Sequence, residues 1–96
     1  MQFSIYCLDN PATPELRPAN RDAHLAYVAQ VGAAIKVAGP LTDEHGTPVG
    51  SLFIVDVANQ EAAEALSAAD PYTQAKVFES SDIRPFKWLI TDGKRV

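Results

Sequence analysis

The sequence predicts an α+β fold of the ferredoxin-like kind, in which the elements follow the order βαββαβ and both helices cover one face of a four-stranded antiparallel sheet. Four segments rich in β-branched and aromatic residues alternate in that order with two segments of helical periodicity. Gly, Pro, Asn and Asp stand at most of the boundaries between them. Because the chain has 96 residues, we expect one domain with a single core, formed by about residues 1–90.

The first strand is expected over residues 3–8, with alternate side chains from Phe3 onward on one face. Asp9, Asn10 and two prolines then end it and open a loop of about ten residues, which is long enough to line a site.

The first helix is expected to begin at about Arg17 or Pro18 and to end at Gly32, which tolerates left-handed dihedrals. Its core stripe should consist of four apolar residues at three- and four-residue steps, which are Leu25, Val28, Val31 and Ile35. His24 lies at the border of this stripe, where a side chain is partly buried and can face a cleft.

Two strands follow. Residues 35–38 should form a short strand that Gly39-Pro40 halts, and a polar turn over 41–48 leads to the next strand. Residues 51–57 are the most continuous apolar run, so this strand should be central and covered on both faces.

The second helix is expected over residues 58–69, with Asn59 as its N-cap and an inward face of small residues, Ala62, Ala65, Leu66 and Ala69. Asp70-Pro71-Tyr72 is a further helix-start signal, since a carboxylate caps free N–H groups and proline pre-sets the backbone. One or two helical turns should follow over 73–77.

The last strand is expected within residues 78–90, with Phe86, Trp88 and Ile90 on one face. Pro85 removes a backbone donor, so this strand should be an edge, bulged or late to begin, and the polar residues 91–96 should be mobile. We expect Phe, Tyr and Trp side chains on the sheet face that the helices leave open. Such a face usually marks an interface, which predicts a homodimer through it.

Composition restricts the partners. The formal net charge is −4, which argues against broad binding to nucleic acid or to an anionic membrane. No apolar run approaches the roughly 20 residues of a membrane-spanning helix, and no signal-peptide pattern is present. Cys7 is the only cysteine, so no internal disulfide can form, and a cytoplasmic location is expected.

The chain contains five short motifs, which are Arg21-x-x-His24-Leu25, Ala38-Gly39-Pro40-Leu41, Gly50-Ser51, Asp70-Pro71-Tyr72 and Ile83-Arg84-Pro85-Phe86. In this order and spacing they resemble the YCII-related (YciI-like) family. The resemblance extends from Met1 to about Leu89. The resemblance implies a dimeric α+β barrel built from ferredoxin-like subunits and a histidine–aspartate pair, here His24 and Asp70. It also implies proton-transfer chemistry on small oxygenated rings without a metal or other cofactor. One branch of the family is associated with dehydrochlorination of a chlorinated hydroxyhydroquinone, and the wider barrel superfamily includes muconolactone isomerases.

His24 and Asp70 are therefore the candidate catalytic residues. An imidazole accepts and returns protons near neutral pH, and a carboxylate held at a helix start can orient it. Each also has a purely structural interpretation, His24 as a satisfied core histidine and Asp70 as a helix cap.

The candidate substrate-binding residues are Arg17, Arg21, Ser51, Tyr72 and Arg84. An arginine can hold a carboxylate or phenolate, although solvated arginines are commoner. The Tyr72 hydroxyl can donate to a substrate oxygen, and packing of its ring is the equal alternative. No spacing of metal ligands recurs, and no base stands near Cys7 in the sequence.

Two functional interpretations and one structural interpretation fit these residues. The first is a small lyase or isomerase that uses the His24–Asp70 pair for general acid–base catalysis. The alternative is a non-catalytic homodimeric module that binds a small ligand or serves as an accessory protein. A purely structural dimerisation unit is the third.

Overall fold

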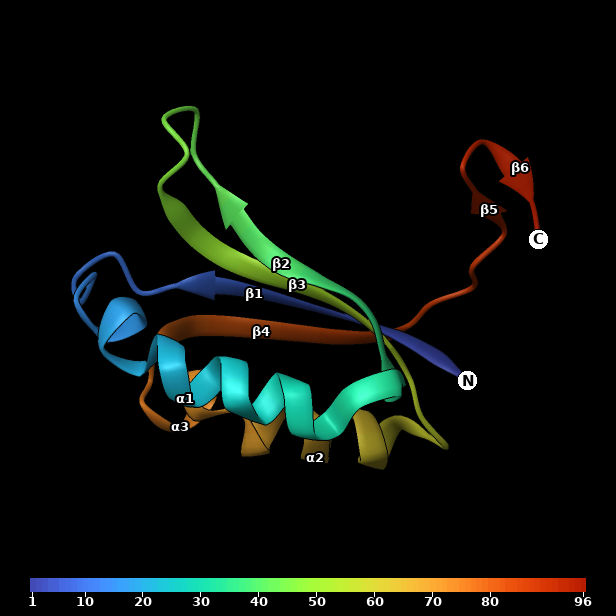
Figure 1. The fold of residues 1–96 in the computed structure, drawn as a ribbon, viewed down its shortest axis with the longest axis horizontal. Helices are drawn as coiled ribbons and strands as arrows, with labels where there is room; N and C mark the ends of the chain where they lie inside the picture. The colour runs from blue at the N-terminus through green and yellow to red at the C-terminus, as the bar shows by residue number, and fades with distance from the viewer.

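In the computed structural model all 96 residues are described, and the predicted order of strands and helices is confirmed (Figure 1). The elements are β1 (Gln2–Asp9), α1 (Leu16–Val31), the 3-10 turn η1 (Gly32–Ala34), β2 (Ile35–Thr42), β3 (Pro48–Asp56), α2 (Gln60–Ala69), α3 (Pro71–Gln74), β4 (Phe78–Pro85), β5 (Ile90–Thr91) and β6 (Lys94–Arg95).

The main sheet has the order β2-β3-β1-β4, with every neighbouring pair antiparallel. All helices lie on one side of it (Figure 1), which is the ferredoxin-like arrangement. β1 and β3 are the central strands, and Ile5 lies opposite Phe53 on one side and Ile83 on the other.

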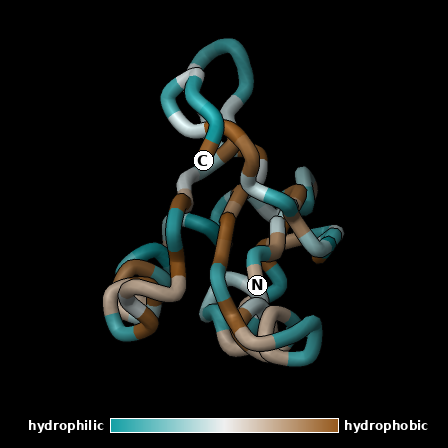
Figure 2. Tube along the Cα trace, turned by 90° about the vertical axis from the view of Figure 1, so that its right-hand side faces the viewer, coloured by the Kyte–Doolittle hydropathy of each residue, from teal (hydrophilic) through white to brown (hydrophobic).

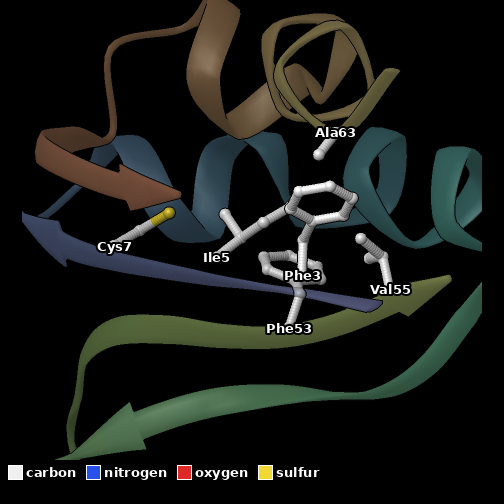
Figure 3. Packing of buried hydrophobic residues seen from close by; sticks show 6 residues of the cluster. All are labelled: Phe3, Ile5, Cys7, Phe53, Val55 and Ala63. Atoms are coloured by element: carbon white, nitrogen blue, oxygen red, sulfur yellow. The ribbon is translucent and has the colours of Figure 1, made fainter. Parts of the chain in front are cut away.

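The core lies between the sheet and the helices (Figure 3). Its six residues are at most 4% exposed and are Phe3, Ile5, Cys7, Phe53, Val55 and Ala63. As predicted, alternate residues of β1 from Phe3 onward point inward. Hydrophobic residues accordingly follow the strand at the centre of Figure 2, and hydrophilic residues occupy the outer loops.

The end of α1 and the start of α2 are confirmed. Gly32 caps α1 with φ +68°, and the Asn59 side chain accepts a hydrogen bond of 2.9 Å from the Ala62 N–H. The inward faces were predicted less well. Leu25 is 45% exposed, although we expected it in the core, and Ile35 begins β2 instead of belonging to the helix.

The inward face of α2 is also displaced from the prediction. Ala63 and Ser67 are buried, whereas Ala65 and Ala69 are exposed. The reason is that alanine occupies so many positions of this helix that several adjoining faces have the same small-residue spacing. Leu66, which packs against the core, belongs to both the predicted and the observed face.

Both edge strands differ from the predicted bounds. β2 continues through Gly39-Pro40 to Thr42, because an edge strand has one unpaired side and tolerates a missing donor. β4 is an edge, as Pro85 predicted, but it ends at that proline. Phe86, Trp88 and Ile90 therefore lie beyond it and share no strand face, and residues 90–95 form a separate hairpin (Figure 1).

The apolar side chains on the open face of the main sheet are aliphatic, apart from one tyrosine, and β4 adds the charged Asp82 and Arg84 to this face. Tyr6, Leu8 and Val37 are exposed on it, and β3 contributes half-buried Leu52 and Ile54. The expectation of Phe and Trp there was wrong, as was the expectation that β3 is covered on both faces. The phenylalanines of β1 and β3 instead pack beneath the helices. None of the helices combines the length and the apolarity needed to cross a membrane.

Candidate active site

His24 and Asp70, 46 residues apart in the sequence, form a hydrogen-bonded pair. His24 projects from α1, and Asp70 stands between α2 and α3 as the C-cap of one and the N-cap of the other. Nδ1 of His24 lies 2.8 Å from Oδ1 of Asp70, and Asp70 is only 4% exposed. The structure thus brings together the two residues that the sequence paired.

Asp70 is fixed by the helix start that Asp70-Pro71-Tyr72 predicted. Its Oδ1 also accepts a hydrogen bond of 2.9 Å from the Tyr72 N–H, and Pro71 begins α3. An ionised carboxylate can only accept, so the Nδ1 of His24 donates the proton to it. Neutral His24 therefore has its free lone pair on Nε2, as a general base requires.

The Tyr72 ring lies against His24. Their ring centroids are 3.9 Å apart and the rings are nearly parallel, at 8°. The Arg17 guanidinium carbon lies 4.8 Å from the same Tyr72 ring centroid. Arg17 precedes His24 by two helical turns, about 10 Å of rise, and the Tyr72 ring contacts both side chains. Burial raises the pKa of the Tyr72 hydroxyl, although the charge of Arg17 opposes the shift.

Arg17 is held by the protein itself. Its Nε and Nη2 donate to the two carboxylate oxygens of Asp9 over 2.7 and 2.8 Å. Nη2 also donates to the Gly50 carbonyl oxygen at 2.8 Å and to Ser51 Oγ at 2.9 Å. Burial disfavours its charged form, but hydrogen bonds to Asp9 and the charge of Asp9 outweigh this and raise the pKa of Arg17. This cluster ties α1 to the ends of β1 and β3.

A cavity of about 670 Å³ lies beside these groups, a volume typical of small-molecule sites. Five of the seven candidate site residues line it, which are Arg17, Arg21, His24, Ser51 and Tyr72. Asp70 does not line it and lies behind His24 instead. Much of the remaining wall is apolar and includes five prolines, Pro11, Pro14, Pro18, Pro40 and Pro48. The loop after β1 lines the cavity, as predicted.

The three candidate arginines have different surroundings. Arg17 is neutralised by Asp9, whereas Arg21 is exposed at the cavity and takes part in no ion pair. Arg84 lies opposite Ser4 on the open face of the sheet and pairs with Asp82 at 2.9 Å. One subunit therefore does not bring Arg84 to the cavity.

Sequence reasoning missed two residues of the site. Asp9 was interpreted only as a strand end, and no local spacing rule links it to Arg17, eight residues later on a different element. Phe53, at 6.1 Å from His24 between ring centroids, faces the histidine edge-on and was expected only as part of a buried strand. No group of three or more His, Cys, Asp or Glu residues is arranged to hold a metal ion.

Comparison with known proteins identifies a matching family and several similar proteins. The chain matches the family model of the YCII-related domain over residues 1–87. An uncharacterized protein of Haemophilus influenzae is 36% identical over 91% of this chain and 97% of its own length. The protein YciI of Escherichia coli is 34% identical over the same shares of the two chains.

Solved structures show the same fold. The 5-chloro-2-hydroxyhydroquinone dehydrochlorinase TftG of Burkholderia phenoliruptrix, in complex with 2,5-dihydroxybenzoquinone, has a TM-score of 0.81 at 29% identity. The match covers 91% of this chain and 94% of that one. An antibiotic biosynthesis monooxygenase has a TM-score of 0.53 at 10% identity, over 93% of this chain and 98% of that one, which is a likeness of fold alone.

Proposed function

This chain belongs to the YCII-related family, and from that premise we propose that it is a small enzyme of the lyase or isomerase class that transfers protons on a small oxygenated or anionic compound. The observation that carries the proposal is the place of His24. It lines a ligand-sized cavity while its Nδ1 is held by a buried carboxylate.

In the proposed reaction, Nε2 of His24 takes a proton from a carbon or oxygen of the substrate. Asp70 stabilises the imidazolium that forms and keeps its ring oriented. An isomerase then returns the proton at another atom, whereas a lyase expels a leaving group with its bonding electron pair. General acid–base catalysis of this kind contributes about 10²–10⁴-fold.

The other cavity residues have supporting roles in this proposal. Arg21 is the cation that holds an acidic oxygen of the substrate, because its charge is unpaired. Tyr72 supplies a hydroxyl donor, since a phenol is protonated at neutral pH. Arg17 and Ser51 bond to each other, and we assign them the role of holding the cavity wall.

A ring compound is the preferred substrate class. The name of TftG gives a chlorinated hydroxyhydroquinone as its substrate, and its complex contains 2,5-dihydroxybenzoquinone. The wall of the cavity here is largely apolar and rigid because of its five prolines, which suits a small planar ring.

We further propose that two copies pair through the open sheet face, where Tyr6, Leu8 and Val37 are exposed. The proposed location is the cytoplasm, since the chain has one cysteine.

The test follows both the proton and the leaving group. Wild-type protein is mixed with 2,5-dihydroxybenzoquinone in D₂O, and loss of the ring C–H signal is followed by NMR. Chloride release is measured with 5-chloro-2-hydroxyhydroquinone. We expect catalysis of at least one reaction and its reduction by about 10²–10⁴-fold in His24→Gln.

His45→Gln is the matched control, because His45 is the other histidine and lies in the exposed turn between β2 and β3, outside the cavity lining. It should react like wild type. A folded His24→Gln variant with full activity would remove the proposal. Ligand binding without exchange or release would instead favour the non-catalytic binding module.

A further inference from the structure

The chain continues past the sheet as an arm, which we define as residues 86–96. Its last bond to the sheet is from the Phe86 N–H to the Gln2 carbonyl oxygen, at 2.9 Å. It then ends in the hairpin of β5 and β6, which turns at Asp92 and Gly93 with φ of 52° and 74°. Figures 1 and 2 place this hairpin on the side of the sheet away from the helices.

The arm is ordered by its own contacts, but its apolar side chains are not covered. The Trp88 indole N–H donates to the Ile90 carbonyl oxygen at 3.0 Å, and Phe86 meets the Trp88 ring edge-on. Four apolar side chains nevertheless remain exposed along it, which are Phe86, Leu89, Ile90 and Val96. A two-stranded hairpin is marginal in water by itself. β5 and β6 pair only with each other, so no other strand of this chain stabilises them.

The arm and the rest of the chain carry opposite charge. The arm holds three basic residues and one acidic residue, which gives a net charge of +2. Residues 1–85 hold five basic and eleven acidic residues, which gives −6. The body of another copy of this chain therefore complements the arm in charge.

The position of the arm also points to a second copy of this chain as its partner. The open face of the sheet is the apolar surface to which a second copy would attach, and the arm rises on that side (Figure 1). We propose that the arm clasps a second copy of this chain, so that its apolar residues pack against the partner's body and its basic residues face the partner's acidic surface. This inference goes beyond the proposed sheet-face dimer, because that dimer can form without the arm.

Trp88 is the only tryptophan and lies within the arm, so native fluorescence reports on the arm directly. The full-length protein is diluted in steps while its mass is followed by analytical ultracentrifugation. We expect Trp88 emission to move to longer wavelength as the dimer dissociates. Added NaCl should weaken the association, because opposite charges are screened.

A matched pair of variants tests which surface is used. Leu89 in the arm and Leu25 on α1 are 44% and 45% exposed, respectively. Leu89→Ser should raise the dissociation constant of the dimer about tenfold, because an apolar side chain loses its burial. Leu25→Ser lies on the helical side and should leave the dissociation constant unchanged.

Three outcomes would overturn the arm proposal. A dimer whose Trp88 emission stays at long wavelength at every concentration would mean that the arm is free, and the sheet-face dimer would survive. A monomer with short-wavelength emission would mean that the arm folds back on its own chain. Equal dissociation constants for the two serine variants and wild type would exclude the arm from the contact.

Discussion

At the residue scale, one oxygen of Asp70 has two tasks. Oδ1 accepts from the Tyr72 N–H at the start of α3 and bonds Nδ1 of His24. The structural and the functional interpretations of Asp70 are therefore not alternatives. Helix capping holds the carboxylate still, and the carboxylate then orients the imidazole.

Replacing Asp70 by asparagine should keep both bonds but remove the negative charge. Asparagine caps a helix about as well as aspartate, so we expect the free energy of unfolding to change by less than about 1 kcal/mol. Its Oδ1 can still accept from the Tyr72 N–H and from Nδ1 of His24, but a neutral amide no longer stabilises the imidazolium that forms when Nε2 takes a proton. The turnover number should fall by about 10²–10⁴-fold.

Asp70→Ala is the matched control for the cap, because it loses both bonds and should cost about 0.5–2 kcal/mol more stability than Asp70→Asn. Urea unfolding and steady-state kinetics measure the two quantities. An Asp70→Asn variant that works at the wild-type rate would contradict a catalytic role for the charge of the carboxylate.

At the element scale, Gly50 of β3 leaves no room for a side chain against β1. A β-carbon added there would lie 2.4 Å from the Cys7 carbonyl oxygen and 3.3 Å from the Leu41 side chain. Because backbone atoms cannot give way cheaply, we expect Gly50→Ala to lower the free energy of unfolding by about 1–3 kcal/mol. Its carbonyl oxygen also accepts from Arg17, so the cavity wall should shift with it.

Gly39→Ala in the neighbouring edge strand is the control, since a β-carbon there meets nothing within 4 Å. Its effect should stay within about 1 kcal/mol and should be stabilising, if any, because it restricts the unfolded chain. Chemical denaturation of both variants decides the matter. Equal losses of stability would show that the close approach at Gly50 is relieved at little cost.

The helices and strands were predicted from the sequence better than the faces that they turn toward the core. Alternation in β1 specified a strand and its inward face, because an alternating pattern fits one register only, whereas the apolar run of β3 specified a strand without showing which face points inward. The alanine-rich α2 could not specify its inward face. Arg84 was expected at the site, but Ile83 before it faces inward, so strand alternation places Arg84 on the opposite face.

At the scale of the site, the sequence predicted the pair but not its surroundings. His24 and Asp70 were matched through a family resemblance and a capping signal. Nothing local to the sequence pairs Asp9 with Arg17 or inserts Tyr72 beside His24, since these contacts depend on how α1 crosses the strand ends. Arg17 and Arg21 were indistinguishable until the structure showed that only one has an acidic partner.

At the scale of the whole molecule, three groups, two of them buried and one half-buried, hold their protons more tightly in the folded state. Burial raises the pKa of the Cys7 thiol and of the Tyr27 and Tyr72 hydroxyls, and the charge of Asp70 adds to the shift in each case. In the unfolded chain the thiol ionises at about pH 8.5 and the phenols at about pH 10. At a pH between the unfolded-state pKa of a group and its raised folded-state pKa, the unfolded state binds fewer protons than the folded state.

The free energy of unfolding should therefore be unaffected by these groups below about pH 8 and should fall as the pH rises from about 9 to 11. Urea unfolding at each pH measures it. Cys7→Ala lowers stability at every pH by removing core volume, but it should also flatten the part of the decline near pH 9. If the free energy of unfolding falls equally steeply near pH 9 in wild type and in Cys7→Ala, the thiol does not cause this part of the decline.

The shared oxygen of Asp70 also has a kinetic consequence. The amide hydrogen of Tyr72 can exchange with solvent deuterium only while its bond to Asp70 is open, and the event that opens it frees the same oxygen that steadies His24. The protection factor of this one amide thus reports the equilibrium between the closed and the open state of the segment that holds the Asp70 carboxylate beside His24.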